Sequence, residues 1–187
     1  LSLTEVRTYS PPASRRWYVR PLRRGEIVEE VMPHAIYHFE SKIISRGAGR
    51  SAIAAAAYQS GEKLYNDYDG LTHDYTKKGG VLYTEILLPP QAPTAWKDRQ
   101  TLWAAVETAE KTKDSRLARQ LIVALPIELG RDDWLLLLRG FIQMECVDKG
   151  MCADFATHDP DGHNPHAHIM VTMRPLDAHG KWQSKTQ

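Results

Sequence analysis

The stretch "HDPDGHNPHAHIMVTMRPL", residues 158–176, places four of the chain's eight histidines within eleven positions and then becomes apolar. In its second half His166, His168 and Met170 alternate with other residues, as the side chains of a half-buried strand do. Side chains two residues apart on a strand point to the same face, with Cα atoms roughly 6.5–7 Å apart. The pattern therefore predicts a strand that carries His166 and His168 on one face.

A third histidine lies at the end of the preceding segment. "MCADFATH" has the composition of a strand and ends at His158, which reaches the same place if the two strands pair through the loop 159–165. Three neutral imidazoles hold a divalent metal without cancelling its charge, and they leave coordination positions open for substrate oxygens. An isolated His-x-His pair is more often a solvent-exposed polar pair. The third histidine therefore favours a metal site formed by His158, His166 and His168.

Other polar residues nearby offer weaker alternatives. Asp159 and Asp161 could make a carboxylate-rich metal loop, but Pro160 and Gly162 favour a turn role for both. His163 is interpreted as a loop histidine and not as a ligand. Three further histidines have no partner visible in the sequence and are expected to be exposed to solvent: His34, His73 and His179.

Outward from these two strands, strand and helix patterns alternate along the chain. Ser51 is a possible N-cap for an alanine-rich helix that contains Tyr58, and Gly79-Gly80 is a turn that leads into a strand. A threonine cap precedes a helix whose apolar residues run from Trp96 to Ala109. The other predicted elements are a strand in "MPHAIYHFESK", a strand in "ARQLIVALP" and a helix over 131–149 stopped by Gly150. The order is typical of an α+β fold, a sheet covered by helices.

Composition limits the class of protein. A chain of 187 residues with 42% hydrophobic residues can bury the core of one domain. The sequence contains neither a membrane-length apolar run nor a leader peptide, so we expect a cytoplasmic protein that does not engage a membrane. Cys146 and Cys152 form no CxxC motif and are expected to be reduced core residues. Residues 1–31 are rich in Arg and Pro without a sustained period, and we interpret them as an extension that precedes a domain at 32–187.

The net charge of +1 argues neither for nor against a nucleic-acid partner. Local basic residues give only supporting evidence for DNA binding: Arg46, Arg50, Lys77 and Lys78. The chain contains no GxSxG, P-loop or HExxH motif, which removes the commonest hydrolase and nucleotide-binding classes. On composition alone, Tyr58 would be a helix residue that faces the core.

Four separated segments in the right order are similar to one known family. "AIYHFESKIISRGAGRSAIAAAAYQSGEKL", "TEILLPPQAP", "VALPIEL" and "NPHAHIMVTMRPL" together resemble the MobA/MobL relaxases, which also occur at the N-terminus of TraA-type conjugation proteins and belong to the HUH endonucleases. The resemblance covers about residues 34–176. It implies an α+β fold with an antiparallel sheet of about five strands, circularly permuted relative to replication initiators, and a chain truncated from a longer protein.

The resemblance also implies an activity. Members of the family are metal-dependent, site- and strand-specific nickases of single-stranded DNA at a plasmid origin of transfer. Its nucleophile maps onto Tyr58, and its metal ligands map onto His158, His166 and His168. The expected product is a 5′-phosphotyrosyl bond with a free 3′ hydroxyl, and the expected cofactor is Mg or Mn, with Zn, Co or Ni also suited to three imidazoles. Expected partners are DNA at the origin of transfer and other proteins of the relaxosome and the conjugation machinery.

One position departs from the family pattern. Many members carry an acidic residue in the strand matched by "LARQLIVALP", where this chain has Gln120, which cannot accept a proton as a base does. Glu85 and Asp161 are the alternative candidates for a general base, and the assignment stays open. Two other functions also stay open: a nickase that initiates rolling-circle replication, and a non-catalytic single-stranded DNA-binding module with aromatic stacking platforms.

Overall fold

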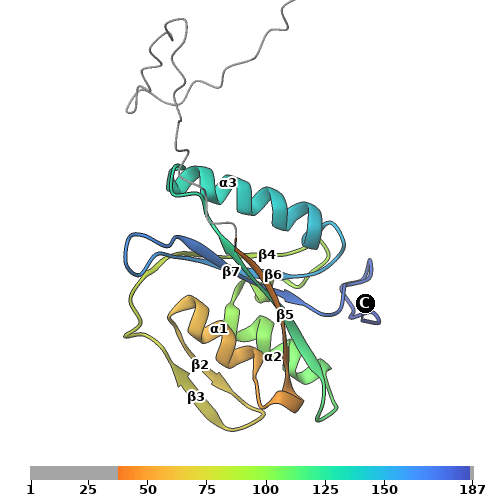
Figure 1. Cartoon of the computed structure of the whole chain (residues 1–187). Coiled ribbons are helices and arrows are strands. Elements are labelled where there is room, and N and C mark those ends of the chain that lie inside the picture. Colours follow the sequence, from red (N-terminus) through yellow and green to blue (C-terminus); the bar gives the residue numbers. More distant parts are fainter. Residues whose placement is uncertain (1–37, 186–187) are drawn as a thin grey trace, which may run out of the picture. The chain divides into compact units, whose positions relative to one another are not determined.

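The computed structural model describes residues 38–185, which form one antiparallel sheet with helices on both of its faces (Figure 1). The sheet has five strands in the order β1-β5-β7-β6-β4. Their bounds are β1 Phe39–Ser45, β4 Val81–Leu87, β5 Arg116–Ala124, β6 Ala153–His158 and β7 His166–Thr172. The expected α+β fold with a five-stranded antiparallel sheet is confirmed.

The helices divide between the two faces of the sheet. Helices α1 (Ala52–Ser60) and α2 (Arg99–Ala109) lie on one face, and α3 (Arg131–Ile142) lies on the other (Figure 1). Strand β7 illustrates this arrangement, because successive side chains of a strand point to opposite faces of the sheet. Met170 packs in the core cluster of α1 and α2, whereas its neighbours Ile169 and Val171 pack in the cluster of α3.

The two histidine strands pair with each other through the loop 159–165, which was the condition for the three histidines to meet. β6 and β7 pair so that His158 lies opposite His166, and Ala156 lies opposite His168. Both histidines of β7 and His158 of β6 therefore share the face covered by α1 and α2. A bilayer-spanning helix is absent from the described part of the chain, since none of its helices has the necessary length and apolar character.

Helix α1 begins as expected and helix α2 does not. The Ser51 side chain accepts a hydrogen bond from Ala54 N and caps α1. The threonine predicted to cap the next helix instead begins a short 3₁₀ turn, η2 (Thr94–Lys97), and Asp98 caps α2 by accepting from Thr101 N. Helix α3 continues into a π-helical turn, η3 (Gln143–Val147), before Gly150 ends the segment with a φ of 84°.

Two further features differ from, or extend, the sequence prediction. The first strand, β1, begins at Phe39, inside the segment 32–42 in which a strand was predicted. The earlier part of that segment, 32–37, and the predicted extension 1–31 lie outside the described residues. A two-stranded hairpin, β2 (Lys63–Asn66) and β3 (Leu71–Asp74), occupies a polar stretch for which no strand was predicted. Cys146 and Cys152 are both free and buried, as predicted.

Candidate active site

Three histidines converge at one end of β6 and β7. One ring nitrogen from each of His158, His166 and His168 lies within 4.8 Å of the others, so the three residues predicted as ligands are brought together. Their ring centroids are separated by 5.4 Å, 4.7 Å and 5.1 Å. The antiparallel register produces this cluster, because it places His158 directly across from His166 and two residue pairs from His168, on the same face.

Backbone carbonyls fix the orientation of two of these rings. His158 Nε2 lies 2.6 Å from the carbonyl oxygen of Gln59, and His166 Nδ1 lies 2.7 Å from the carbonyl oxygen of Asn164. Because a carbonyl only accepts, each of these nitrogens carries the hydrogen when the ring is neutral. The opposite nitrogens, Nδ1 of His158 and Nε2 of His166, then present lone pairs. Carbonyl contacts of this kind orient metal-binding histidines in proteins.

Burial keeps two of the rings neutral. Loss of solvation lowers the pKa of His158 from 6.5 to about 4, and the nearby ammonium of Lys78 adds to that effect. Burial also lowers the pKa of His168, to about 3, with smaller contributions from the neighbouring histidines. Both rings are therefore uncharged at neutral pH, which is the form that binds a metal.

The residues of this cluster suit a divalent ion. Nδ1 of His168 is buried and has no hydrogen-bond partner in the described part of the chain. Unpaired buried nitrogens are uncommon in folded proteins, and a bound cation would pair with such an atom. Asp159, considered above as a ligand in an alternative site, instead accepts a hydrogen bond from Asn164 N within the turn. The three imidazoles are thus the donor set that fits a metal here.

Tyr58 lies near the C-terminal end of α1, close to the histidines. Its side chain is 46% exposed, so it does not face the core as composition alone would suggest. The next residue, Gln59, is fully buried and provides the carbonyl that binds His158. Gln59 also donates from Nε2 to the carbonyl oxygen of Asp154 on β6. These two contacts fasten the end of α1 to the strand that carries His158.

An open groove extends from Tyr58 across the sheet. It has a volume of about 580 Å³, and both Tyr58 and His168 line it. The hairpin residues Leu71 and His73 also line it, as does Gln120 of β5. Two cationic side chains, Lys42 and Arg50, also line the groove. The groove therefore joins the tyrosine and a candidate ligand in a space that opens to solvent.

The four basic residues predicted for DNA binding have different environments. Arg50 is exposed on the groove, and Lys77 is exposed on the turn before β4. Lys78 contacts Tyr58, both at its carbonyl oxygen and over its ring. Arg46 is engaged inside the protein: its guanidinium pairs with Glu107 at 2.7 Å, and the two side chains are only 8% and 6% exposed.

The contacts of Arg46 explain why it is held inside. Glu107 on α2 accepts from Ala52 N at the beginning of α1, and its second oxygen accepts from Arg46. Arg46 thereby supports the junction between α1 and α2. We do not retain it among the DNA-binding candidates.

The three candidate bases lie in different places, and the sheet separates Glu85 from Tyr58. Glu85 lies on the α3 face, where it accepts hydrogen bonds from Arg139 Nε and the Tyr83 hydroxyl, so it cannot reach Tyr58. Asp161 is exposed on the loop between β6 and β7. Gln120 lines the groove with Tyr58 and His168. Of these three residues, only Gln120 lines the same groove as the candidate nucleophile.

Some residues of the groove were missed by sequence reasoning. Lys42 lies on the same face of β1 as Glu40 and Ile44, because side chains two residues apart point the same way. This pattern could have placed Lys42 on the same face as the histidines. His73 was expected to be exposed, but its side chain is only 19% exposed, and its Nε2 lies 3.9 Å from Oδ2 of Asp69. That expectation was wrong because the hairpin carrying His73 was not predicted. His179 is exposed, as expected, and His163 lies exposed in the loop 159–165. His34 lies outside the described residues.

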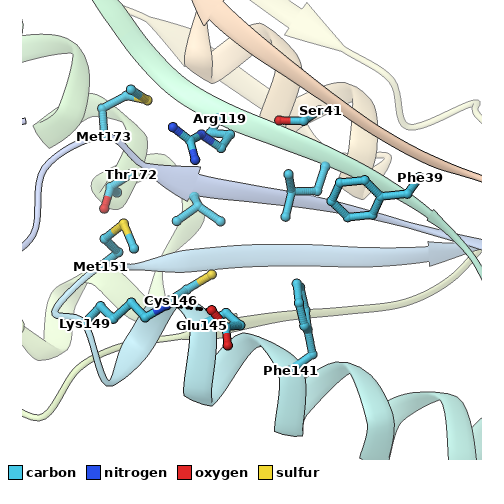
Figure 2. A pocket seen from close by; sticks show the side chains of 12 residues that line it. Phe39, Ser41, Arg119, Phe141, Glu145, Cys146, Lys149, Met151, Thr172 and Met173 are labelled. Atoms are coloured by element: carbon cyan, nitrogen blue, oxygen red, sulfur yellow. Dashed lines mark hydrogen bonds and ion pairs between the residues drawn. The ribbon is translucent and has the colours of Figure 1, made fainter. Parts of the chain in front are cut away.

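A second cavity, of about 500 Å³, lies on the opposite face of the sheet (Figure 2). Phe39, Arg119 and Phe141 line it, together with the ion pair Lys149–Glu145 from the end of the α3 segment (Figure 2). None of the three histidines and no tyrosine contributes to its lining. The histidine cluster and Tyr58 therefore lie apart from this cavity, on the α1 and α2 face.

Comparison with known proteins identifies the family. The family model described as "MobA/MobL family" matches residues 50–187, which is more than half of the chain. The chain belongs to the MobA/MobL family. The resemblance found in the sequence is thereby confirmed. The match spans helix α1, with Tyr58, and all three histidines.

Individual relatives agree with this assignment. The chain is 42% identical to a conjugal transfer protein TraA from Rhizobium radiobacter over 76% of its own length, and 40% identical to a mobilization protein MobL from Acidithiobacillus ferridurans over 78%. A solved structure described as "Molecular Basis of Vancomycin Resistance Transfer in Staphylococcus aureus" has a TM-score of 0.75 and 35% identity, and it covers 82% of this chain and 78% of that one. The chain spans only 14% of the length of the TraA relative and 35% of the MobL relative.

Proposed function

We propose that this MobA/MobL chain is the nicking domain of a conjugative relaxase. In this proposal it cleaves one strand of DNA at a plasmid origin of transfer and remains joined to the 5′ end through Tyr58. The observation that carries the proposal is the position of Tyr58 and His168 in one open groove, with His158 and His166 completing a three-imidazole cluster. The names of the relatives, conjugal transfer and mobilization proteins, support DNA at a transfer origin as the substrate.

The groove has features that suit a DNA strand. Lys42 and Arg50 would contact phosphates, and such contacts fix the register of a nucleic acid without reading its sequence. The imidazole cluster would hold the divalent ion, for which Mg or Mn is expected and Zn, Co or Ni is compatible with three nitrogen ligands. When bound, that ion would withdraw charge from the scissile phosphate.

The chemical step exchanges one phosphodiester for another. The Tyr58 hydroxyl oxygen attacks phosphorus in line, loses its proton, and forms the tyrosyl ester to the 5′ side. The bond from phosphorus to the 3′ oxygen breaks, and that oxygen takes up a proton. Because the phosphodiester is conserved and not hydrolysed, the 3′ hydroxyl can later attack the tyrosyl ester and rejoin the strand.

Gln120 would act in this step by hydrogen bonding alone. Its amide can orient the phenol or a water molecule, but it cannot remove the proton. The proton from Tyr58 would therefore pass to solvent, which the 46% exposure of the Tyr58 side chain permits.

We also propose that the nicking domain occupies residues 32–187.

A covalent adduct is the decisive test. The chain would be incubated with single-stranded oligonucleotides tiled across transfer origins and, separately, replication origins of candidate plasmids, and then separated on a denaturing gel. We expect an adduct with the transfer-origin oligonucleotides, located on Tyr58 by mass spectrometry and absent in Tyr58→Phe. Tyr65→Phe is the matched control, since Tyr65 is a similarly exposed tyrosine on the hairpin. Adducts only with replication origins would favour an initiator nickase, and binding without any adduct would favour a non-catalytic DNA-binding module.

A further inference from the structure

Lys78 contacts the candidate nucleophile at two points. It lies on the turn between β3 and β4, and its ammonium donates a hydrogen bond of 2.9 Å to the carbonyl oxygen of Tyr58. The same nitrogen lies 3.8 Å from the centroid of the Tyr58 ring. One cationic group therefore contacts both the main chain and the aromatic face of a single residue.

The contact over the ring is favourable in itself. The face of an aromatic ring carries negative charge and attracts a cation within about 6 Å of the centroid. A second contact with the ring comes from Tyr75, whose ring meets that of Tyr58 edge to face with centroids 5.3 Å apart. Tyr58 is thus held by Lys78 and Tyr75, although nearly half of its side chain is exposed.

The turn that carries Lys78 packs between the end of α1 and the loop 159–165, which joins β6 to β7. Gly80 has a φ of 81°, and a Cβ atom there would lie 2.7 Å from Cα of Pro160, so no larger residue fits without movement. Asp159 N donates to Gly80 O across the same contact. On the other side, Tyr75 N donates to the carbonyl oxygen of Glu62, just beyond the end of α1.

These contacts determine where the ammonium lies. Lys78 is half-buried, and burial lowers its pKa while its charge in turn lowers the pKa of His158 and His168. The hydrogen bond to the Tyr58 carbonyl and the contact over its ring therefore hold the ammonium against Tyr58.

We infer that Lys78 is a positioning residue for Tyr58, and that it holds the ring in the orientation needed for in-line attack. This inference rests on the proposed function, in which Tyr58 is the nucleophile. In-line attack requires the hydroxyl oxygen at roughly 3–3.5 Å from phosphorus, and a displacement of about 1 Å can cost on the order of a hundredfold in rate. Lys78 therefore acts on the rate of the covalent step more than on the affinity for DNA.

The experiment compares three variants in single-turnover cleavage at saturating oligonucleotide. Lys78→Met keeps the length of the side chain and removes its charge, and we expect the rate of adduct formation to fall by about tenfold to a hundredfold while the Kd for DNA changes less than about threefold. Lys78→Arg keeps a cation that stacks on aromatic rings, and it is expected to restore the rate to within about fivefold of wild type. Lys77→Met removes the same charge from the neighbouring exposed residue, so the difference between the two Met variants measures the contact with Tyr58.

Each alternative result has a defined meaning. If Lys78→Met forms the Tyr58 adduct at the wild-type rate, the inference is overturned. It is also overturned if Lys78→Met only weakens DNA affinity and reduces its salt dependence to the same extent as Lys77→Met, because Lys78 is then a phosphate contact. If Lys78→Arg is as slow as Lys78→Met although both melt at the wild-type temperature, the cation is not what positions the ring. If wild type forms its adduct on another tyrosine, the proposed function fails at its nucleophile, which is a separate result from a Lys78 variant failing on a Tyr58 adduct.

Discussion

On the α1 and α2 face of the sheet, β6 and β7 carry His158, His166 and His168, whereas on the α3 face the same two strands carry Phe155 and Ile169. The two sides of this strand pair thus differ in chemistry where the histidines lie. His168 lines the groove, while Phe155 and Ile169 are fully buried under α3. The apolar side can therefore stabilise the strands while the other side carries polar groups, and changes to the two sides should have separable effects.

The largest effect is expected from removing one imidazole. His168→Ala should reduce nicking by more than about a thousandfold, as should an excess of chelator, because two imidazoles form an incomplete ligand set. The Kd for single-stranded DNA should change less than about threefold, since the ion acts on one phosphate and the groove on many. Metal titration calorimetry and a nicking assay measure both effects. His163→Ala, on the exposed loop, is the control, and full nicking by metal-stripped protein in chelator would contradict the role of the ion.

A change on the α3 face should instead reduce stability. Ile142→Ala removes a fully buried side chain of α3, and we expect it to lower the free energy of unfolding by about 2–5 kcal/mol. Urea denaturation measures this loss. Leu136→Ala, at a position 71% exposed on the same helix, should change stability by no more than about 0.5 kcal/mol. If folded Ile142→Ala protein had lost its affinity for metal, the two faces would not be separable.

The histidine face should make the metal-free protein sensitive to acid. The pKa of His158 is lowered to about 4 and that of His168 to about 3, while both titrate near 6.5 in the unfolded chain. Below pH 6.5 the unfolded state therefore binds protons that the folded state does not. The free energy of unfolding should fall with decreasing pH between about 6.5 and 4, by at most about 1.4 kcal/mol per pH unit for each histidine. Urea titrations of wild type and His158→Asn across this range would test it, since the variant should show a smaller dependence on pH.

The smallest effect is expected at the rim of the groove. Arg50→Ala should weaken DNA binding modestly and reduce the slope of log Kd against log salt by about 1, as expected for the loss of one phosphate contact. Arg46→Ala should leave that slope unchanged and lower thermal stability, because it breaks the nearly buried pair with Glu107. Fluorescence anisotropy at several salt concentrations distinguishes the two variants. Equal slopes for Arg46→Ala and Arg50→Ala would contradict this assignment.

Short-range patterns account for the parts of the fold that the sequence predicted correctly. Alternation at His166, His168 and Met170 is a property of neighbouring residues, and so is the capping of α1 by Ser51. The convergence of His158 with the other two histidines followed from one assumption, the pairing of two strands through a short loop. That pairing is now observed in the register of β6 and β7.

Contacts between distant residues account for what the sequence did not reveal. Nothing near Arg46 in the chain indicates its partner Glu107, 61 residues away. The β2–β3 hairpin was missed because its sequence is polar, whereas its support comes from outside: Gln100 on α2 accepts a hydrogen bond from Tyr65 N and donates one to Tyr65 O. The contact of Lys78 with Tyr58, 20 residues apart, likewise depends on how the turn packs against α1.

The hydrogen bond between Gln59 and His158 has a thermodynamic consequence. Gln59 directly follows Tyr58, so the candidate nucleophile and a candidate ligand are separated by a single peptide unit and one contact of 2.6 Å. Under the proposed function, any adjustment of the end of α1 that accommodates the DNA also changes the environment of His158. Binding of the strand and binding of the ion are then linked equilibria, and linkage is reciprocal: the factor by which an oligonucleotide strengthens or weakens the affinity for metal equals the factor by which metal changes the affinity for that oligonucleotide.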